Sequence, residues 1–154
     1  MPKESAGLLL HRRRNGALEV LLVHPGGPFW INKDLGAWTI PKGEIMPGER
    51  PLDAAQREFR EETGHTIVGA FQPLRPVQQS GRKIVHAWAV EADLDPATVT
   101  SNHFEMEWPP RSGHRRSFPE IDRAQWFGLD QARRKIIKAQ AALLEELVAL
   151  QSRS

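Results

Sequence analysis

The chain contains no cysteine among its 154 residues, which excludes disulfide bonds and thiolate metal sites. It also lacks a long hydrophobic run. Stretches such as Ala6 to Leu10 are far shorter than the about 20 apolar residues that span a bilayer. The first residues do not follow the charged-then-apolar pattern of a secretory signal. We therefore expect a cytoplasmic protein with no membrane partner.

Net charge is also small, +2 at pH 7, which argues against nucleic acid as a partner. The basic clusters Arg12–Arg14 and Arg111–Arg116 are local, and we interpret them as solvated loops. The 40% hydrophobic and 26% charged residues are typical of a globular protein. The sequence shows no internal repeat and no low-complexity linker, so residues 1–154 are expected to form a single domain.

The first half of the chain predicts a β-hairpin. Two apolar runs, Ala6 to His11 and Leu18 to His24, flank the turn signal Asn15-Gly16. A Gly- and Pro-rich loop should follow from Pro25 to Leu35. We expect a short extended segment from Trp38 to Ile40 after this loop.

The next segment predicts a helix with both ends marked. Pro51 suits a first helical turn, and Gly64 suits the position just past the last one. Leu52, Ala55 and Phe59 recur at helical spacing and give the helix one apolar face.

The remaining segments predict further strands and a closing helix. Thr66 to Val77, Arg82 to Ala92 and Arg123 to Phe127 have the composition of strands, and Asp93 to Pro119 is expected to be irregular. Leu129 to Leu150 predicts one long helix. Together these elements predict a mixed β-sheet with helices on its faces, an α/β or α+β sandwich.

Three carboxylates crowd one ridge of the predicted helix. At about 100° per residue, Glu58, Glu61 and Glu62 cover an arc of roughly 100° beside the apolar face. Like charges at this spacing are unfavourable in a helix, as is negative charge near its C-terminus. One interpretation is an ordinary solvated face, with Arg57 and Arg60 offsetting the acids. The other is a site for a hard divalent cation such as Mg²⁺, which takes oxygen ligands.

The spacing of the surrounding residues favours the metal site. The stretch from Gly43 to His65 resembles the Nudix box: G, five residues, E, seven residues, R-E, a bulky apolar residue, one residue, E-E, one residue, G and a bulky apolar residue. The residues that fit this pattern are Gly43, Glu49, Arg57, Glu58, Phe59, Glu61, Glu62 and Gly64. His65 departs from the apolar last position. We expect it to face the strand after the helix and to change packing there without loss of chemistry.

The resemblance implies a Nudix-like α/β/α sandwich that hydrolyses a pyrophosphate bond, with Mg²⁺, or Mn²⁺ in its place, as cofactor. By position, Glu58, Glu61 and Glu62 would bind the metal, and the carbonyl of Gly43 would add a ligand. Glu58 is the first choice for the group that takes the proton from water. Arg57 would offset the negative charge and pair with Glu49 to hold the loop against the helix.

Residues outside the box complete the expected site. The resemblance implies a further acid, for which Glu105, Glu107 and Glu120 are candidates. We favour Glu120, because it precedes a predicted strand in a loop that could reach the site. Lys42 could contact a substrate phosphate. Trp38 is either a core residue, which we favour, or a stacking surface for the substrate.

The substrate is expected to be a small-molecule nucleotide, either a nucleoside triphosphate or a dinucleoside polyphosphate. The Trp-x-x-Pro-Lys-Gly segment from Trp38 to Gly43 resembles that of diadenosine polyphosphate and diphosphoinositol phosphate hydrolases, although the chain has no tyrosine, which the former often place downstream of the box. Two alternatives remain open: a pyrophosphatase of ADP-ribose or nucleotide sugars, and a non-catalytic nucleotide-sensing module. Loss of box carboxylates would favour the sensor, but all are present.

Overall fold

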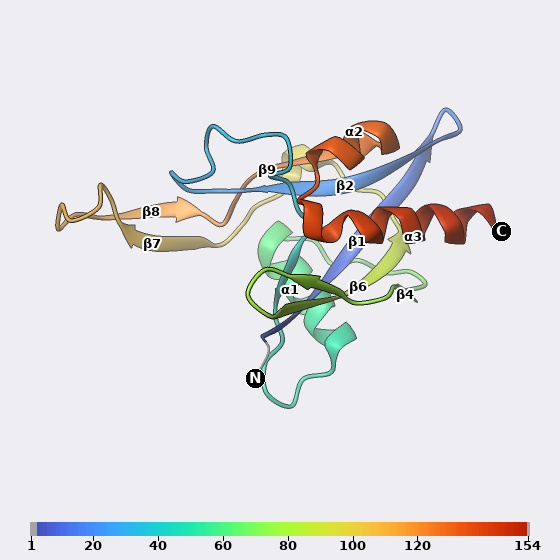
Figure 1. The fold of residues 1–154 in the computed structure, drawn as a ribbon, viewed down its shortest axis with the longest axis horizontal. Coiled ribbons are helices and arrows are strands. Elements are labelled where there is room, and N and C mark those ends of the chain that lie inside the picture. The colour runs from blue at the N-terminus through green and yellow to red at the C-terminus, as the bar shows by residue number, and fades with distance from the viewer. Residues whose placement is uncertain (1–2, 154) are drawn as a thin grey trace.

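The computed structural model describes residues 3–153 and opens with the predicted hairpin (Figure 1). Strand β1 (Glu4–Arg14) pairs antiparallel with β2 (Ala17–Pro25). Asn15 and Gly16 form the turn with φ values of 52° and 80°. Positive φ at both central residues is the geometry that a tight hairpin turn requires, and Asn and Gly tolerate it.

The central sheet is mixed, as predicted. Its main path runs β4-β6-β1-β2-β9, in which β6 (Lys83–Glu91) is parallel to β1 and β9 (Ile121–Gly128) is antiparallel to β2. Short strands extend it: β3 pairs with β1, and both β4 and β5 pair with β6. Their bounds are Lys42–Glu44 for β3, Gln72–Pro73 for β4 and Val77–Gln79 for β5.

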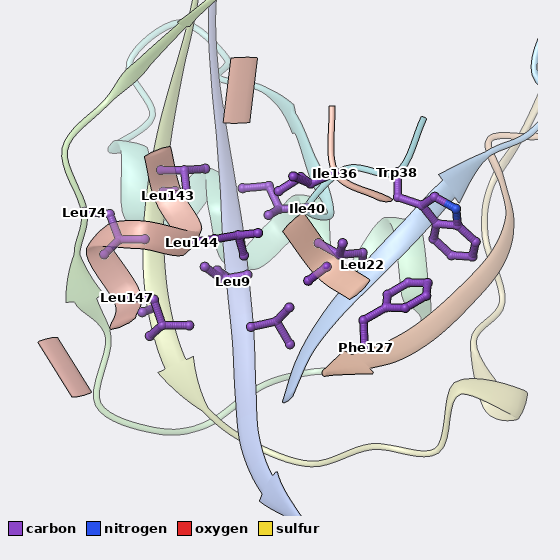
Figure 2. Packing of buried hydrophobic residues seen from close by; sticks show 14 of the residues in the cluster. Leu9, Leu22, Trp38, Ile40, Leu74, Phe127, Ile136, Leu143, Leu144 and Leu147 are labelled. Carbon is purple, nitrogen blue, oxygen red and sulfur yellow. The ribbon is translucent and has the colours of Figure 1, made fainter. Parts of the chain in front are cut away.

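Successive residues of the central strands lie on opposite faces of the sheet and form two hydrophobic layers. Leu8 and Leu21 pack with helix α1 (Pro51–Thr63) on one face of the sheet. Leu9 and Leu22 pack on the other face, against the C-terminal segment (Figure 2). This alternation makes the fold an α/β/α sandwich.

Helix α1 has the predicted ends, and of its predicted apolar face Ala55 and Phe59 are buried whereas Leu52 is only half-buried. Pro51 occupies its first turn, and Gly64 caps its C-terminus with φ 78° while donating its N–H to the carbonyl of Arg60 at 2.8 Å. Ala55 and Phe59 are fully buried. The opposite side of the helix is left free to carry charged groups.

The prediction of one helix from Leu129 to Leu150 is wrong. The structure has α2 (Leu129–Lys135), a 3₁₀ turn η2 (Lys138–Gln140) and α3 (Ala141–Ser152). Between α2 and η2 the chain is extended, and Ile137 donates its N–H to the carbonyl of Trp38 at 2.8 Å while Trp38 donates to the carbonyl of Lys135 at 2.9 Å. Ile136 still donates its N–H to the carbonyl of Ala132 at 2.9 Å, so pairing with the Trp38 segment replaces the helical hydrogen bond from Ile137 onward.

Two other expectations need correction. Within the expected strand from Thr66 to Val77, only Gln72–Pro73 and Val77 belong to strands, although Leu74 between them still donates its N–H to the carbonyl of Ala87 at 2.9 Å. The expected irregular segment from Asp93 to Pro119 instead contains a 3₁₀ turn η1 (Pro96–Thr98) and a hairpin.

That hairpin forms a separate two-stranded sheet that extends beyond the body of the molecule (Figure 1). It consists of β7 (His103–Glu107) and β8 (Arg115–Pro119). Neither strand contains a fully buried residue, so its hydrophobic signal is weak. The alternation of Phe104, Met106 and Trp108 was the pattern that could have revealed it.

No helix within residues 3–153 is long and apolar enough to cross a membrane.

Candidate active site

The glycine that opens the box-like stretch lies directly beneath a carboxylate of the helix. Gly43 lies in β3, opposite Ala6 of β1. A Cβ atom added at Gly43 would lie 2.0 Å from both Cδ and Oε2 of Glu58. Any side chain at position 43 would therefore displace the Glu58 carboxylate. The lack of space beside Glu58 is enough to require glycine there.

Arg57 ties the loop before the helix to the helix itself. Its Nε and Nη2 donate to the two carboxylate oxygens of Glu49 at 2.8 and 2.9 Å, and Nη2 also donates to the carbonyl of Glu44 at 3.0 Å. The bidentate guanidinium holds the pKa of Glu49 down at about 2. The Glu49–Arg57 pair that was predicted to hold the loop against the helix is thus present as a bidentate ion pair.

The same guanidinium reaches two of the three ridge carboxylates. Nη1 of Arg57 donates to Oε1 of Glu58 at 2.8 Å and to Oε2 of Glu61 at 3.1 Å. One oxygen of each carboxylate is engaged in this way. A single positive charge therefore faces several negative ones, which leaves the ridge with an excess of negative charge.

Glu62 is the most perturbed acid of the ridge. Its Oε2 accepts the backbone N–H of Lys42 at 3.1 Å. Burial, with the charges of Glu58 and Glu120 adding to its effect, raises the pKa of Glu62 to about 8. Burial also raises the pKa of Glu58, with Glu61 and Glu120 adding to the effect against Arg57. The protein thus holds partly buried carboxylates together at an electrostatic disadvantage, as sites for cations and for catalysis do.

Glu120 lies next to this ridge although it is far from it in sequence. It occupies the bend between β8 and β9, where its N–H donates to the carbonyl of Asn102 at 2.8 Å and its carbonyl accepts from Gly26 at 2.9 Å. Its charge acts on both Glu58 and Glu62. The structure therefore brings the favoured outside acid to the box residues.

The other two candidate acids lie on the projecting hairpin. Glu105 and Glu107 belong to β7, and Glu107 accepts the backbone N–H of Arg111 at 2.6 Å. Neither is among the charges that shift the pKa of Glu58 or Glu62.

Sequence analysis missed the part played by Gly26. A Cβ at Gly26 would lie 2.0 Å from the carbonyl oxygen of Pro119, so the loop after β2 reaches the Glu120 bend only because residue 26 has no side chain. The paired glycines at positions 26 and 27 were the available signal.

Lys42 borders the site, whereas Trp38 does not. Burial lowers the pKa of Lys42, against the opposing charges of Glu62 and Glu58. Trp38 is 1% exposed, donates Nε1–H to Asp34 at 2.8 Å and packs edge-on to Phe127. It belongs to the core, as favoured, and the alternative of a stacking surface for the substrate is wrong.

His65 also differs from expectation. Its Nε2 hydrogen-bonds to the hydroxyl of Thr98 at 2.8 Å. It therefore faces the η1 turn and not the strand that follows the helix, because the chain after Gly64 forms no strand until Gln72.

The ridge carries the carboxylate oxygens that Mg²⁺ prefers as ligands, but these oxygens do not form a coordination geometry. Among residues 3–153, no three acidic or histidine side chains are gathered in the geometry of a metal site. The reason is visible in the contacts: Arg57 draws Glu58 and Glu61 toward itself, and Glu62 turns to the Lys42 amide. All three groups are nevertheless hard oxygen donors, and a divalent cation would favour the charged form of Glu58 and Glu62, whose pKa values are raised.

Comparison with known proteins places the chain in a family. The NUDIX domain model matches residues 1–147. The chain is 30% identical over 145 residues to asymmetrical bis(5'-nucleosyl)-tetraphosphatase of Sus scrofa, covering 86% of this chain and 83% of that protein. The corresponding Mus musculus enzyme is 34% identical over 103 residues, 59% of this chain and 66% of that protein.

Solved structures agree with the sequence relatives. A Caenorhabditis elegans Ap4A hydrolase in a binary complex superimposes with a TM-score of 0.69 and 25% identity, covering 99% of each chain. The chain therefore belongs to the NUDIX family. It is an enzyme of the Nudix pyrophosphohydrolase type, as the box-like stretch predicted.

Proposed function

We propose that this enzyme hydrolyses a pyrophosphate bond of a dinucleoside polyphosphate in a Mg²⁺-dependent reaction. The observation that carries the proposal is the pair of partly buried carboxylates Glu58 and Glu62, held beside each other and beside the exposed Glu120 against their mutual repulsion. The relatives support the substrate class, since the pig and mouse proteins are bis(5'-nucleosyl)-tetraphosphatases.

Glu58, Glu61 and Glu62 would hold Mg²⁺, with the carbonyl of Gly43 as a further ligand. When bound, the metal would neutralise charge on the bridging phosphates. It would compete with Arg57 for Glu58 and Glu61, each of which keeps one oxygen outside its contact with that guanidinium.

The protein supplies groups for the proton transfer and for binding the phosphates. Glu58 takes the proton of the attacking water, because a carboxylate with a raised pKa is a better base near neutral pH. Glu120 approaches from a different element, on a bend fixed by both of its backbone hydrogen bonds. Lys42 lies beside Glu62 and would offer its ammonium group to a substrate phosphate.

The test is a screen of nucleotide pyrophosphates with the purified enzyme and Mg²⁺, with both products identified. The substrates are diadenosine tetraphosphate, nucleoside triphosphates, ADP-ribose and nucleotide sugars. We expect diadenosine tetraphosphate to give ATP and AMP, with no activity after chelation and recovery with Mg²⁺ or Mn²⁺. Preference for ADP-ribose would correct the substrate class. Full activity after exhaustive chelation would refute the metal assignment, and binding of nucleotides without any cleavage would favour the sensing module.

A further inference from the structure

A cavity of about 650 Å³ lies between the loop that follows β2 and the projecting β7–β8 hairpin. Its walls are largely apolar or aromatic and come from both segments. They include Pro28, Ile31, Asn32, Trp108, Phe118 and Asp122. Phe29 packs edge-on against Trp108, with ring centroids 5.4 Å apart. A concave site of this size and lining is typical of pockets for small organic ligands.

The two walls are fixed to each other, so the cavity is already formed in the structure. Gly26 approaches the carbonyl of Pro119 so closely that no side chain fits, and Gly27, with φ 99°, packs under the ring of Phe104. The far end of the loop is held by His24, whose Nε2 hydrogen-bonds to the carbonyl of Lys33 at 2.6 Å. The loop therefore has little freedom to close the cavity.

One acidic residue of the lining is held by a buried partner. His24 is fully buried, and its Nδ1 hydrogen-bonds to Oδ1 of Asp122 at 2.8 Å. Arg123 lies 3.9 Å from the same oxygen. Asp122 lines the cavity with a side chain that is 27% exposed, so its second oxygen can accept a hydrogen bond from a ligand. Arg116 is the cationic residue of the lining.

The cavity adjoins the acidic ridge. Pro119 and Asp122 line it, and Glu120 lies between them in the chain. The charge of Glu120 reaches Glu58 and Glu62. A ligand with its polyphosphate at the ridge could thus extend a further group past the Glu120 bend into the aromatic cavity.

We propose that this cavity binds a nucleoside end of the substrate, with the base against Trp108 and Phe118 and a donor group of the nucleoside on Asp122. Aromatic side chains stack on any nucleobase. A carboxylate accepts hydrogen bonds from ring or amino N–H groups and from ribose hydroxyls. The inference rests on the proposed function for the placement of the phosphates. It adds that the β7–β8 hairpin, outside the box, provides the recognition of the base.

The test is binding by calorimetry with AMP, GMP and ribose 5-phosphate, which lacks a base, so that it does not require turnover. Trp108→Leu removes an aromatic wall. Asp122→Asn removes the charge while an amide at 122 can still hydrogen-bond to His24. Trp30→Leu is the matched control, a change of the same type in the loop that faces the hairpin, at a residue outside the lining. Thermal unfolding confirms that each variant is folded.

We expect the wild-type enzyme to bind at least one nucleoside monophosphate at least tenfold more tightly than ribose 5-phosphate. Trp108→Leu should abolish that difference, Asp122→Asn should reduce it, and Trp30→Leu should preserve it. Equal binding of nucleotide and ribose 5-phosphate to the wild-type enzyme would overturn the inference. So would nucleotide binding that neither cavity variant changes, whether or not hydrolysis is observed. If the enzyme cleaves no substrate but binds nucleotides through Trp108, the proposed function fails and the nucleoside cavity stands.

Discussion

Replacing Gly43 by alanine should disable the site while leaving the fold intact. The strand backbone at Gly43, paired with Ala6, is a conformation that alanine also adopts. The added Cβ would lie 2.0 Å from Cδ and Oε2 and 2.6 Å from Cγ of Glu58. The side chain of Glu58 is the group that must yield, because the helix backbone beneath it is anchored by the buried Ala55 and Phe59.

The expected loss follows from the size of this displacement. Carbon atoms pack at about 3.5 Å or more, so the Glu58 carboxylate must move by roughly 1.5 Å. A misplacement of about 1 Å at a reacting centre lowers the rate by about 100-fold. That corresponds to about 2.7 kcal/mol of lost transition-state stabilisation. We therefore expect turnover of Gly43→Ala to fall by about two orders of magnitude.

Gly128→Ala is the matched control. Gly128 has φ −61°, and apart from its chain neighbours no described atom lies within 4 Å of its Cβ position. Turnover of diadenosine tetraphosphate at saturating Mg²⁺ should be unchanged in this variant, and thermal unfolding should show both variants folded. Full activity in Gly43→Ala would refute the reasoning, because the Glu58–Gly43 contact would then have no part in the active arrangement. Equal losses of activity and folded protein in Gly43→Ala would also contradict it.

Three further predictions concern the outside acid, the loop and the core. Glu120→Gln should lower turnover at least tenfold, about 1.4 kcal/mol, and Glu105→Gln and Glu107→Gln should have smaller effects. Unchanged turnover in Glu120→Gln, together with a large loss in either of the other two variants, would contradict the placement of the bend. The pKa of Glu49 falls from 4.5 to about 2 on folding, so its stabilising effect exists above pH 4.5 and is lost as pH drops toward 2. Glu49→Gln should therefore flatten the acid limb of a melting-temperature profile, and an unchanged limb would argue against the ion pair. Leu144→Ala should lower the unfolding free energy by about 2–5 kcal/mol in urea titration, and a loss below about 1 kcal/mol would contradict tight packing there.

The sequence predicted the parts of the fold that local signals determine. The Asn15-Gly16 turn and the Pro51 and Gly64 ends of α1 follow from backbone preferences of single residues, and the structure contains all three. The long C-terminal helix was wrong because its interruption depends on pairing between Ile137 and Trp38, residues far apart in the chain. No periodicity of the segment itself records that contact.

For the candidate site too, local spacing predicted some features, whereas contacts between distant segments were not predicted. The box spacing was enough to identify the family and to place Glu58, Glu61 and Glu62 on one ridge. It could not show that Arg57 binds two of these carboxylates, because that depends on side-chain conformations. The aromatic cavity was not predicted either, since it forms only where the loop after β2 meets the projecting hairpin.

The central claim is that the ridge carboxylates support cleavage of a pyrophosphate bond with a divalent metal. The most direct measurement compares turnover of Glu58→Gln and Glu62→Gln with the wild-type enzyme, at saturating Mg²⁺ and diadenosine tetraphosphate, alongside their thermal unfolding. Each substitution keeps the shape of the side chain and removes its charge, which relieves repulsion on the ridge. We predict that turnover falls by orders of magnitude while the melting temperature is unchanged or higher. Unchanged turnover in Glu62→Gln, or a loss of activity that only follows a loss of folded protein, would contradict the account.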